Sequence, residues 1–297
     1  LKKMPASFSE ADKARLSAAM RIAIAKKIVP AYQKLARFVK NDYAPQGRTE
    51  VGLWALPQGD LRYAYQAKTA TTTNLTPEEI HQIGLAEVAR LEAEMLKVAQ
   101  KLGYADVAAL REGILKNTAL YPKSRQEIVD LYSKYTEQTY SKLPQLFGRL
   151  PKAKVEVIAT EEWQEMGAYQ DPYNYYGHLQ EEMKRAIRLV VDTGLHYKKW
   201  SRQQVVDFFH AHSGMDEINI QSETDRYIAW PAQALTYKIG QMKISQLRQY
   251  ARTELGDKFD IRAFHDVVLG GGALPLDVLD KQVKAWVASQ KATLAAK

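Results

Sequence analysis

Apolar residues recur at spacings of three and four along most of this chain, the pattern of helices that bury one face. The first such stretch begins after Ser9, a residue suited to cap a helix, and continues to about Lys40. Its apolar positions are Leu16, Met20, Ala23, Ile24, Ile28 and Tyr32. Pro30 lies inside this pattern and is expected to kink or divide the helix, because proline removes a donor and clashes with the preceding turn.

Three capping boxes predict further helix starts, since a Ser or Thr followed three residues later by Glu or Gln satisfies two main-chain donors at once. They are Thr76–Glu79, Ser124–Glu127 and Ser201–Gln204. Pro77 fits the first position of its helix, and Gly103 is expected to close it. Asp260 is expected to cap a last short helix before the GGGALP sequence.

Residues 43–74 depart from the helical pattern through alternation, turn residues and a run of threonines, and they predict a small β excursion. The VEVIA sequence at residues 155–159 is the other good strand candidate. We therefore predict a mainly α, multi-helix fold and a single domain over residues 1–297. Its N-terminal part spans residues 1–163 and its C-terminal part residues 164–297.

Composition narrows the class of protein. The 297 residues are 46% hydrophobic and 26% charged, which is enough for a sizeable core. No stretch reaches the roughly 20 apolar residues of a membrane-spanning helix. The absence of cysteine excludes disulfides and thiolate metal sites but does not determine the compartment.

The net charge of +8 raises the question of nucleic-acid binding. Basic residues are interspersed with acidic ones, as in EVARLEAEMLK, and this pattern argues against a nucleic-acid partner. Binding of an anionic substrate or of an envelope surface explains the excess of positive charge equally well. The N-terminal sequence LKKMPASFSEADK has no signal-peptide pattern, and Leu1 is not an initiator methionine. We expect that a leader or a preceding segment has been removed.

The histidines do not form a zinc-hydrolase motif, which needs two histidines four apart on a helix with a glutamate between them. His178 and Glu182 share a helix face, but one such pair is weak support for a metal. The sequence also contains no nucleophile elbow, phosphate loop or dinucleotide fingerprint. We assign no metal ligand in this chain.

The densest polar series lies inside an apolar helical pattern near Pro231. It consists of Glu223, Arg226, Tyr227, Gln233, Tyr237 and Lys238. Arg226 could clamp a carboxylate, and the Tyr237 hydroxyl could donate to a developing oxyanion. We take both as candidate catalytic residues, with Glu223, Gln233 and Lys238 as candidate substrate-binding residues. A buried structural network would use the same side chains, and spacing alone does not separate the two interpretations.

Two further candidates come from the stretch before this series. His196 is a third candidate catalytic residue, because Asp192 lies four positions earlier and can orient its imidazole. A purely structural pair is an equally good interpretation. Tyr173 lies in the aromatic sequence YQDPYNYY, which is typical of a substrate-contacting loop, although its tyrosines could simply pack a turn on the core.

Longer motifs give a family resemblance. The motifs are GLWALPQG and TATTTNLTPEEIHQIGLAEVARLEAEM in the first half, then MGAYQDPY, RAIRLVVDTGLH, RYIAWPAQALTYKIG and FDIRAFHDVVLGGGALPL. With these motifs in this order, the chain resembles the bacterial domain-of-unknown-function family 885. Members of that family resemble helical zinc metallopeptidases of the gluzincin type. The resemblance covers most of residues 42–280.

The resemblance implies a zincin-like scaffold and a zinc segment of His-Glu-x-x-x-x-His-His style with a downstream glutamate ligand. That segment should lie between Trp163 and Gln164, where two family motifs are adjacent here, so we expect a missing segment at this junction. For the intact protein the resemblance implies zinc, a peptide or peptide-like substrate, and a periplasmic or lipoprotein-anchored location. We expect the chain as it stands to be soluble and inactive. The alternative is a non-catalytic helical binding module of the cell envelope. We predict that Tyr237 and Arg226 point into the largest cleft, beside His196.

Overall fold

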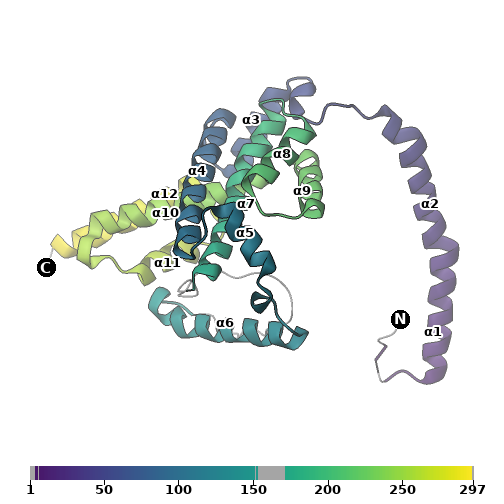
Figure 1. Cartoon of the computed structure of the whole chain (residues 1–297), viewed down its shortest axis with the longest axis horizontal. Coiled ribbons are helices and arrows are strands. Elements are labelled where there is room, and N and C mark those ends of the chain that lie inside the picture. The colour runs from purple at the N-terminus through teal and green to yellow at the C-terminus, as the bar shows by residue number, and fades with distance from the viewer. Residues whose placement is uncertain (1–3, 6, 151, 153–170, 296–297) are drawn as a thin grey trace. The chain divides into compact units, whose positions relative to one another are not determined.

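The computed structural model describes residues 4–5, 7–150, 152 and 171–295 (Figure 1). Within these ranges the chain forms helices, turns and loops and contains no strand, which confirms the mainly α prediction. The chain divides into two units, Leu1–Glu50 and Val51–Lys297. The predicted junction between residues 163 and 164 and the predicted strand at residues 155–159 lie outside the described residues. The single domain predicted for residues 1–297 stays a prediction.

The first unit is one helical segment with two π-helical turns. Its elements are α1 (Glu10–Ala23), the π turn η1 (Ile24–Ile28), α2 (Val29–Phe38), the π turn η2 (Val39–Tyr43) and the short turn η3 (Ala44–Gln46). Ser9 caps α1 by accepting from the Asp12 amide at 3.1 Å. Pro30 lies in the first turn of α2, directly after η1. The expected disturbance by Pro30 thus takes the form of a π turn, which needs no hydrogen bond from the proline.

The second unit contains the remaining elements. They are η4 (Leu53–Ala55), α3 (Gly59–Thr71), α4 (Pro77–Lys101), α5 (Val107–Lys116), η5 (Thr118–Leu120), α6 (Arg125–Leu146), α7 (Pro172–His196), α8 (Arg202–His212), α9 (Glu217–Ala229), η7 (Gln233–Leu235), α10 (Thr236–Leu255), η8 (Gly256–Lys258), α11 (Ile261–Gly270) and α12 (Leu276–Ala295). The helix starts predicted from the caps are confirmed. Thr76 and Ser201 form complete capping boxes, and the Ser124 and Asp260 side chains accept from the first turns of α6 and α11.

The main core lies between α4 and α7, the two longest helices of this unit, which pack along each other. Gly84 marks their close approach, because a Cβ built there would lie 2.7 Å from Val190 Cγ2 and 2.8 Å from Leu189 Cβ. From Ala186 to His196 every residue of α7 is buried. A helix that is buried all round has no solvent-facing side for its polar residues, so Arg188, Asp192 and His196 need partners inside the protein.

Two smaller cores complete the unit. One joins α10, α11 and α12 around Phe264 and Val283. The other joins α3, η7 and the start of α10 to α4 and α7 around Tyr63, Ile80 and Leu235. The second of these cores holds η7 against the middle of α7, and this placement forms the candidate site described below.

The β excursion predicted for residues 43–74 is not observed, because these residues contain η3, η4 and the helix α3. Tyr63, Ala67 and Thr71 are spaced by four and buried in α3, so tertiary packing decides in favour of a helix. Thr72, at φ 53°, ends it. In the part of the chain that is described, no helix combines the length and apolar character needed to span a membrane.

Candidate functional site

Two arginines from different helices converge on one amide side chain. Arg188, in α7, is 7% exposed, and its Nη2 donates to Oε1 of Gln233 at 3.3 Å. Arg226, on α9, donates through Nη1 to the same oxygen at 2.8 Å. Gln233 lies in η7, between α9 and α10. Two positive charges therefore meet where α7, α9 and α10 come together. We call Arg188, Arg226, Gln233 and the Tyr237 ring the arginine cluster.

One carboxylate, Glu223, balances Arg226. Arg226 donates to its two oxygens at 3.2 and 2.7 Å, and the Tyr227 hydroxyl donates to it at 2.5 Å. Burial alone would raise the pKa of Glu223, but the hydrogen bonds from Arg226 and Tyr227 outweigh it and lower the pKa to about 2. Burial and the hydrogen bond to Glu223 raise the pKa of Tyr227 well above its usual range. Glu223 is therefore an anion and Tyr227 a neutral donor at neutral pH.

Arg188 is less well balanced than Arg226. Its Nε is buried and has no hydrogen-bond partner among the described residues. Its guanidinium lies 5.8 Å from the centre of the Tyr227 ring and 5.2 Å from that of Tyr237. A buried guanidinium that lies between aromatic rings and an amide gains some cation–π attraction but lacks a hydrogen-bonded anion. Among the described residues, no carboxylate is hydrogen-bonded to this guanidinium.

Tyr237, at the start of α10, forms the outer side of the arginine cluster. Its side chain is 55% exposed, and its ring lies 5.7 Å from the Arg185 guanidinium as well as 5.2 Å from that of Arg188. The arginines against its ring are thus Arg185 and Arg188, and the predicted pairing of Tyr237 with Arg226 stays a prediction. Two pockets defined by described residues lie elsewhere, and neither contains Arg226 or Tyr237. Their predicted position in the largest cleft therefore stays a prediction.

His196 is fully buried at the end of α7 and bonds to two main-chain groups. Its Nδ1 accepts from the Leu53 amide at 3.1 Å, so this nitrogen carries no proton. Its Nε2 lies 3.1 Å from the Tyr227 carbonyl oxygen, which can only accept, so Nε2 carries the proton. His196 is thus a neutral imidazole that ties η4 to α9, next to Arg226. This geometry supports a positioning role, and its predicted catalytic role stays a prediction.

Asp192, predicted to orient His196, is buried between α3 and η7. It accepts from the Tyr63 hydroxyl at 2.6 Å and from the Ala232 amide at 3.0 Å. Burial raises the pKa of Asp192 to about 7, against the opposing effects of these hydrogen bonds and of the nearby Arg188 charge. Ala232 is held at φ 67° beside this carboxyl, which shapes the chain between α9 and η7.

Lys238 follows Tyr237 in sequence but lies in different surroundings, because consecutive helical residues point about 100° apart. It is 2% exposed, and its Nζ lies 3.0 Å from Glu87 and 3.5 Å from Glu182. Burial would raise the pKa of Glu87, but Arg90 and Lys238 together lower it. These four residues line a pocket of about 270 Å³ between α4, α7 and α10. The charges of this group are balanced, which favours a structural network.

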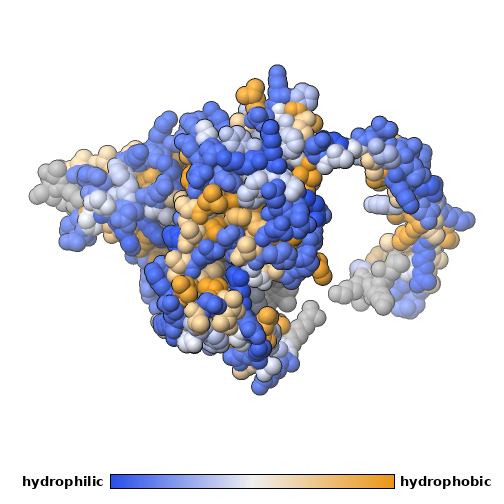
Figure 2. Space-filling view, turned by 45° about the horizontal axis from the view of Figure 1, so that its top comes forward, coloured by the Kyte–Doolittle hydropathy of each residue, from blue (hydrophilic) through white to orange (hydrophobic). Residues whose placement is uncertain are grey.

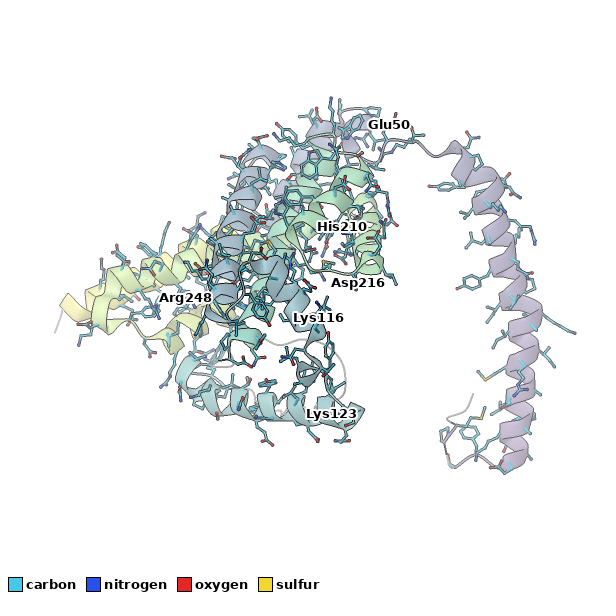
Figure 3. All side chains as sticks on the ribbon, viewed as in Figure 1. Glu50, Lys116, Lys123, His210, Asp216 and Arg248 are labelled. Carbon is cyan, nitrogen blue, oxygen red and sulfur yellow. The ribbon has the colours of Figure 1, made fainter. Side chains whose placement is uncertain are left out.

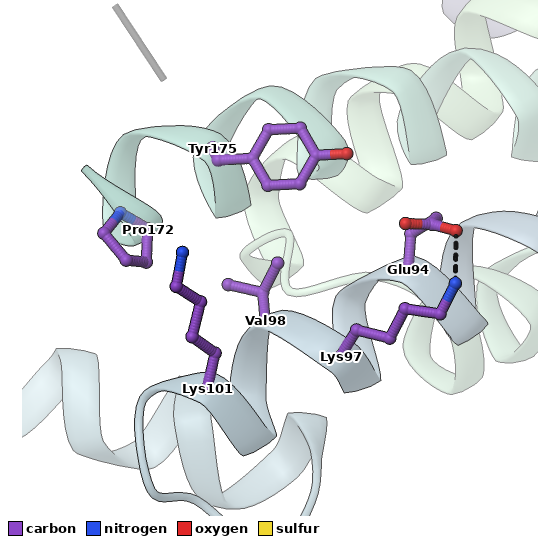
Figure 4. A pocket seen from close by; sticks show the side chains of 6 residues that line it. All are labelled: Glu94, Lys97, Val98, Lys101, Pro172 and Tyr175. Atoms are coloured by element: carbon purple, nitrogen blue, oxygen red, sulfur yellow. Dashed lines mark hydrogen bonds and ion pairs between the residues drawn. The ribbon is translucent and has the colours of Figure 1, made fainter. Parts of the chain in front are cut away.

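Tyr173 lies in the first turn of α7, where it packs against the main core. A hydrogen bond with Tyr104 raises the pKa of its hydroxyl. The neighbouring Tyr175 and Pro172 border a pocket of about 180 Å³ at this end of α7 (Figure 4). Its remaining lining residues, from α4, are Glu94, Lys97, Val98 and Lys101. Tyr173 is thus partly buried in a helical turn at the opposite end of α7 from His196, and its predicted role in substrate binding stays a prediction.

The structure brings together Arg226, Glu223, Gln233 and Tyr237 around Arg188. Arg188 is not among the candidate site residues selected from the sequence. A charged residue at a core position of a helical pattern was the available signal. The described residues do not fit a metal, since no group of three or more His, Asp or Glu side chains comes together among them. The predicted pair of His178 and Glu182 is in contact at 3.5 Å, but it is only a pair.

The sequence model of a bacterial family of unknown function, DUF885, matches residues 1–165 and 161–283. The structure is similar to one described as "The crystal structure of the putative lipoprotein from Colwellia psychrerythraea", with a TM-score of 0.87 and 28% identity over 96% of this chain. This chain spans 64% of the length of that protein. A "putative lipoprotein of unknown function from Shewanella oneidensis" has the same fold, with a TM-score of 0.66, 14% identity and coverage of 93% of this chain and 67% of that one. No curated protein matches the sequence.

Proposed function

The chain belongs to the bacterial DUF885 family, and on that basis we propose that the intact protein is a peptidase-like hydrolase that binds peptides or peptide-like substrates at the arginine cluster. The Arg188 side chain is the observation that carries this proposal. It is a buried guanidinium with an unpartnered Nε, beside a half-exposed tyrosine. Guanidinium groups bind carboxylates through paired N–H donors, and a peptide ends in a carboxylate.

The residues around Arg188 suit a peptide ligand. Arg226 supplies N–H donors, one of which bonds to the side-chain amide of Gln233. The Tyr237 ring lies against the Arg188 guanidinium on the solvent side. In this proposal the Tyr237 hydroxyl donates to the peptide carbonyl oxygen as negative charge develops on it. Glu223 holds Arg226 in place and is already ionised at neutral pH.

Zinc belongs to the proposal only through the family resemblance. A bound zinc ion would supply an activated water for hydrolysis. Because the described residues do not offer three ligands in one place, we draw no chemical step from them. We propose that the ligands belong to a segment of longer family members. The two family matches, which meet at residues 161–165, support a missing segment at that point.

The location proposed for the intact protein is the periplasm or a lipid-anchored position at the cell envelope. Each of the two similar structures carries the description "putative lipoprotein", which supports this location. An anchored protein of this kind needs no membrane-spanning helix of its own.

The second candidate is a helical module of the envelope that binds peptides without cleaving them. The lack of a three-ligand group among the described residues favours this candidate for the chain taken alone. The two functions differ in what the full-length product of the gene does. Zinc content and chelator-sensitive peptide hydrolysis in the full-length product alone support the hydrolase. If neither form holds zinc or cleaves peptides but both bind them, the protein is a binder.

Calorimetric titration of the chain tests the arginine cluster directly. A short peptide with a free C-terminal carboxylate should bind at least tenfold more tightly than the same peptide with a C-terminal amide. Arg188→Lys keeps the charge but loses the planar pair of donors, so this preference should fall about tenfold. Arg252→Lys is the matched control, because the Arg252 guanidinium also lies against an aromatic ring, 5.5 Å from the centre of Phe259, but outside the arginine cluster, and it should leave the preference unchanged. Equal affinity for acid and amide in the wild-type chain would reject the site.

A further inference from the structure

Residues 13–41, inside the helical segment of the first unit, carry a charge equal to the whole net charge of the protein, and with Glu10, Asp12 and Asp42 the segment carries +5. Between Lys13 and Asn41 there are eight lysines and arginines and no aspartate or glutamate. The rest of the chain contains 34 basic and 34 acidic residues, which cancel, while the formal net charge of the chain is +8. The basic excess is therefore concentrated on this one segment and not spread over the solvated faces of the protein.

The same segment has an apolar face, and none of its residues is buried. Large apolar side chains recur at spacings of three and four through η1, α2 and η2, and each is between 41% and 69% exposed; they are Ile24, Ile28, Tyr32, Leu35, Phe38 and Val39. Residues at these spacings lie on one side of a helix. Apolar residues are visible on the surface of this segment in Figure 2, and its side chains project to all sides in Figure 3.

Four basic residues of this segment, Lys26, Lys34, Arg37 and Lys40, lie on the side away from Ile28 and Leu35. Lys27 borders the apolar stripe beside Phe38, and Arg21, three positions before Ile24, lies on the apolar side. With about 100° per residue, Lys34 and Arg37 lie together on a face turned away from Ile28 and Leu35. From Ile24 to Lys40 the segment thus combines an aliphatic and aromatic face with charged residues that are all basic, the combination found in helices that lie in the surface layer of a membrane.

We propose that the helical segment Glu10–Tyr43 lies on an anionic lipid surface, with its apolar face among the acyl chains and its lysines and arginines against the phosphate groups. The charge is complementary to such a surface, and each basic residue near it strengthens binding roughly fivefold. Nucleic acid would also attract the charge but would leave the apolar stripe in water. This inference is independent of the proposed peptide site, because it rests on residues of the first unit alone.

Flotation of the whole chain with lipid vesicles tests the proposal. The chain should float with vesicles of phosphatidylcholine containing phosphatidylglycerol, should bind vesicles of phosphatidylcholine alone far less, and should be released by salt. Lys34→Gln with Arg37→Gln should lower the partition coefficient roughly thirtyfold. Ile28→Gln with Leu35→Gln should lower it by about tenfold or more, because two apolar side chains no longer leave water.

The controls use exposed residues of the second unit. Leu61 and Leu115 are 69% and 71% exposed, so Leu61→Gln with Leu115→Gln repeats the apolar change outside the helical segment and should leave flotation unchanged. Glutamine is a good helix former, and circular dichroism should show each variant as helical as the wild-type chain.

Several results would overturn the proposal. They are the absence of flotation with anionic vesicles, equal binding to neutral and anionic vesicles, and an equal loss in the control variant. Tighter binding to duplex DNA than to vesicles, unaffected by Ile28→Gln with Leu35→Gln, would assign the charge to nucleic acid. Self-association in solution that this variant abolishes, without lipid binding, would assign the apolar face to a second copy of the chain.

Discussion

Replacing Asp192 with asparagine tests whether the folded protein binds a proton on the buried carboxyl that lies where α3, α7 and η7 meet. Asp192 is fully buried, and its Oδ1 accepts from Tyr63 at 2.6 Å and from the Ala232 amide at 3.0 Å. An asparagine keeps an acceptor oxygen at this position but cannot ionise. Because burial raises the pKa of Asp192 to about 7, the wild-type chain should depend on pH in a range where the variant does not.

The sign and size of the effect follow from the two pKa values. The folded-state pKa lies above the ordinary value of 3.8, so the folded chain holds this proton more tightly than the unfolded chain does. The associated stability is fully present below pH 3.8 and is lost as the pH rises through 7. One pKa unit corresponds to about 1.4 kcal/mol, so the free energy of unfolding of the wild-type chain should fall by roughly 2 kcal/mol relative to Asp192→Asn between about pH 5 and about pH 7.

Urea unfolding followed by far-ultraviolet circular dichroism measures this difference at a series of pH values. The comparison between the two chains cancels the titration of every other group, including His81, whose pKa burial lowers. Asp207 is exposed and accepts from Gln203, so Asp207→Asn is a matched control that should follow the wild-type curve. Parallel curves for the wild-type chain and Asp192→Asn would refute the reasoning, because they would mean that Asp192 titrates as an exposed carboxyl does.

Three further predictions concern packing, charge and turnover. Gly84→Ala should lower the free energy of unfolding by about 1–3 kcal/mol in the same urea assay, since its Cβ would lie 2.7 Å from Val190, whereas Gly177→Ala, with open space around it, should not. The wild-type chain should lose stability as the pH falls from 4.5 toward 2, because hydrogen bonds lower the Glu223 pKa against the effect of burial, and Glu223→Gln should not show this loss. An equal loss of stability in both chains over this pH range would contradict this. In the full-length family protein, Tyr237→Phe should lower kcat roughly a hundred- to thousandfold with little change in KM, and unchanged turnover would assign Tyr237 to structure.

Helix starts were predictable because the capping signal is local. Thr76, Ser124, Ser201 and Asp260 each accept from an amide of the next few residues, and no distant part of the protein is needed to form that bond. The helix α3 was missed because its sequence is locally ambiguous. The spacing of Tyr63, Ala67 and Thr71 was readable, but the α4, α7 and η7 contacts that make the helix favourable are distant in sequence.

The candidate site was predictable in its residue types and less so in its partners. The bonds from Arg226 to Glu223 and Gln233 follow from proximity along α9 and η7. The contact of Arg188 with Gln233 spans 45 positions and depends on how α7 crosses η7, which no local pattern encodes. His196 and Asp192 lie four apart on α7, but main-chain groups that are distant in sequence, at Leu53 and Ala232, bond to them.

The two π turns of the first unit have a consequence for changes in chain length. In η1 the Val29 amide bonds to the Ile24 carbonyl, and in η2 the Ala44 amide bonds to the Val39 carbonyl, so each turn contains one residue more than an α turn. Loss of one residue within Ile24–Ile28 would leave an ordinary α turn and preserve the alignment of the helices on both sides. The same deletion inside α2 would rotate everything beyond it by about 100° and separate the apolar stripe into two misaligned halves. Relatives of different length in this region should therefore gain or lose residues at these two turns.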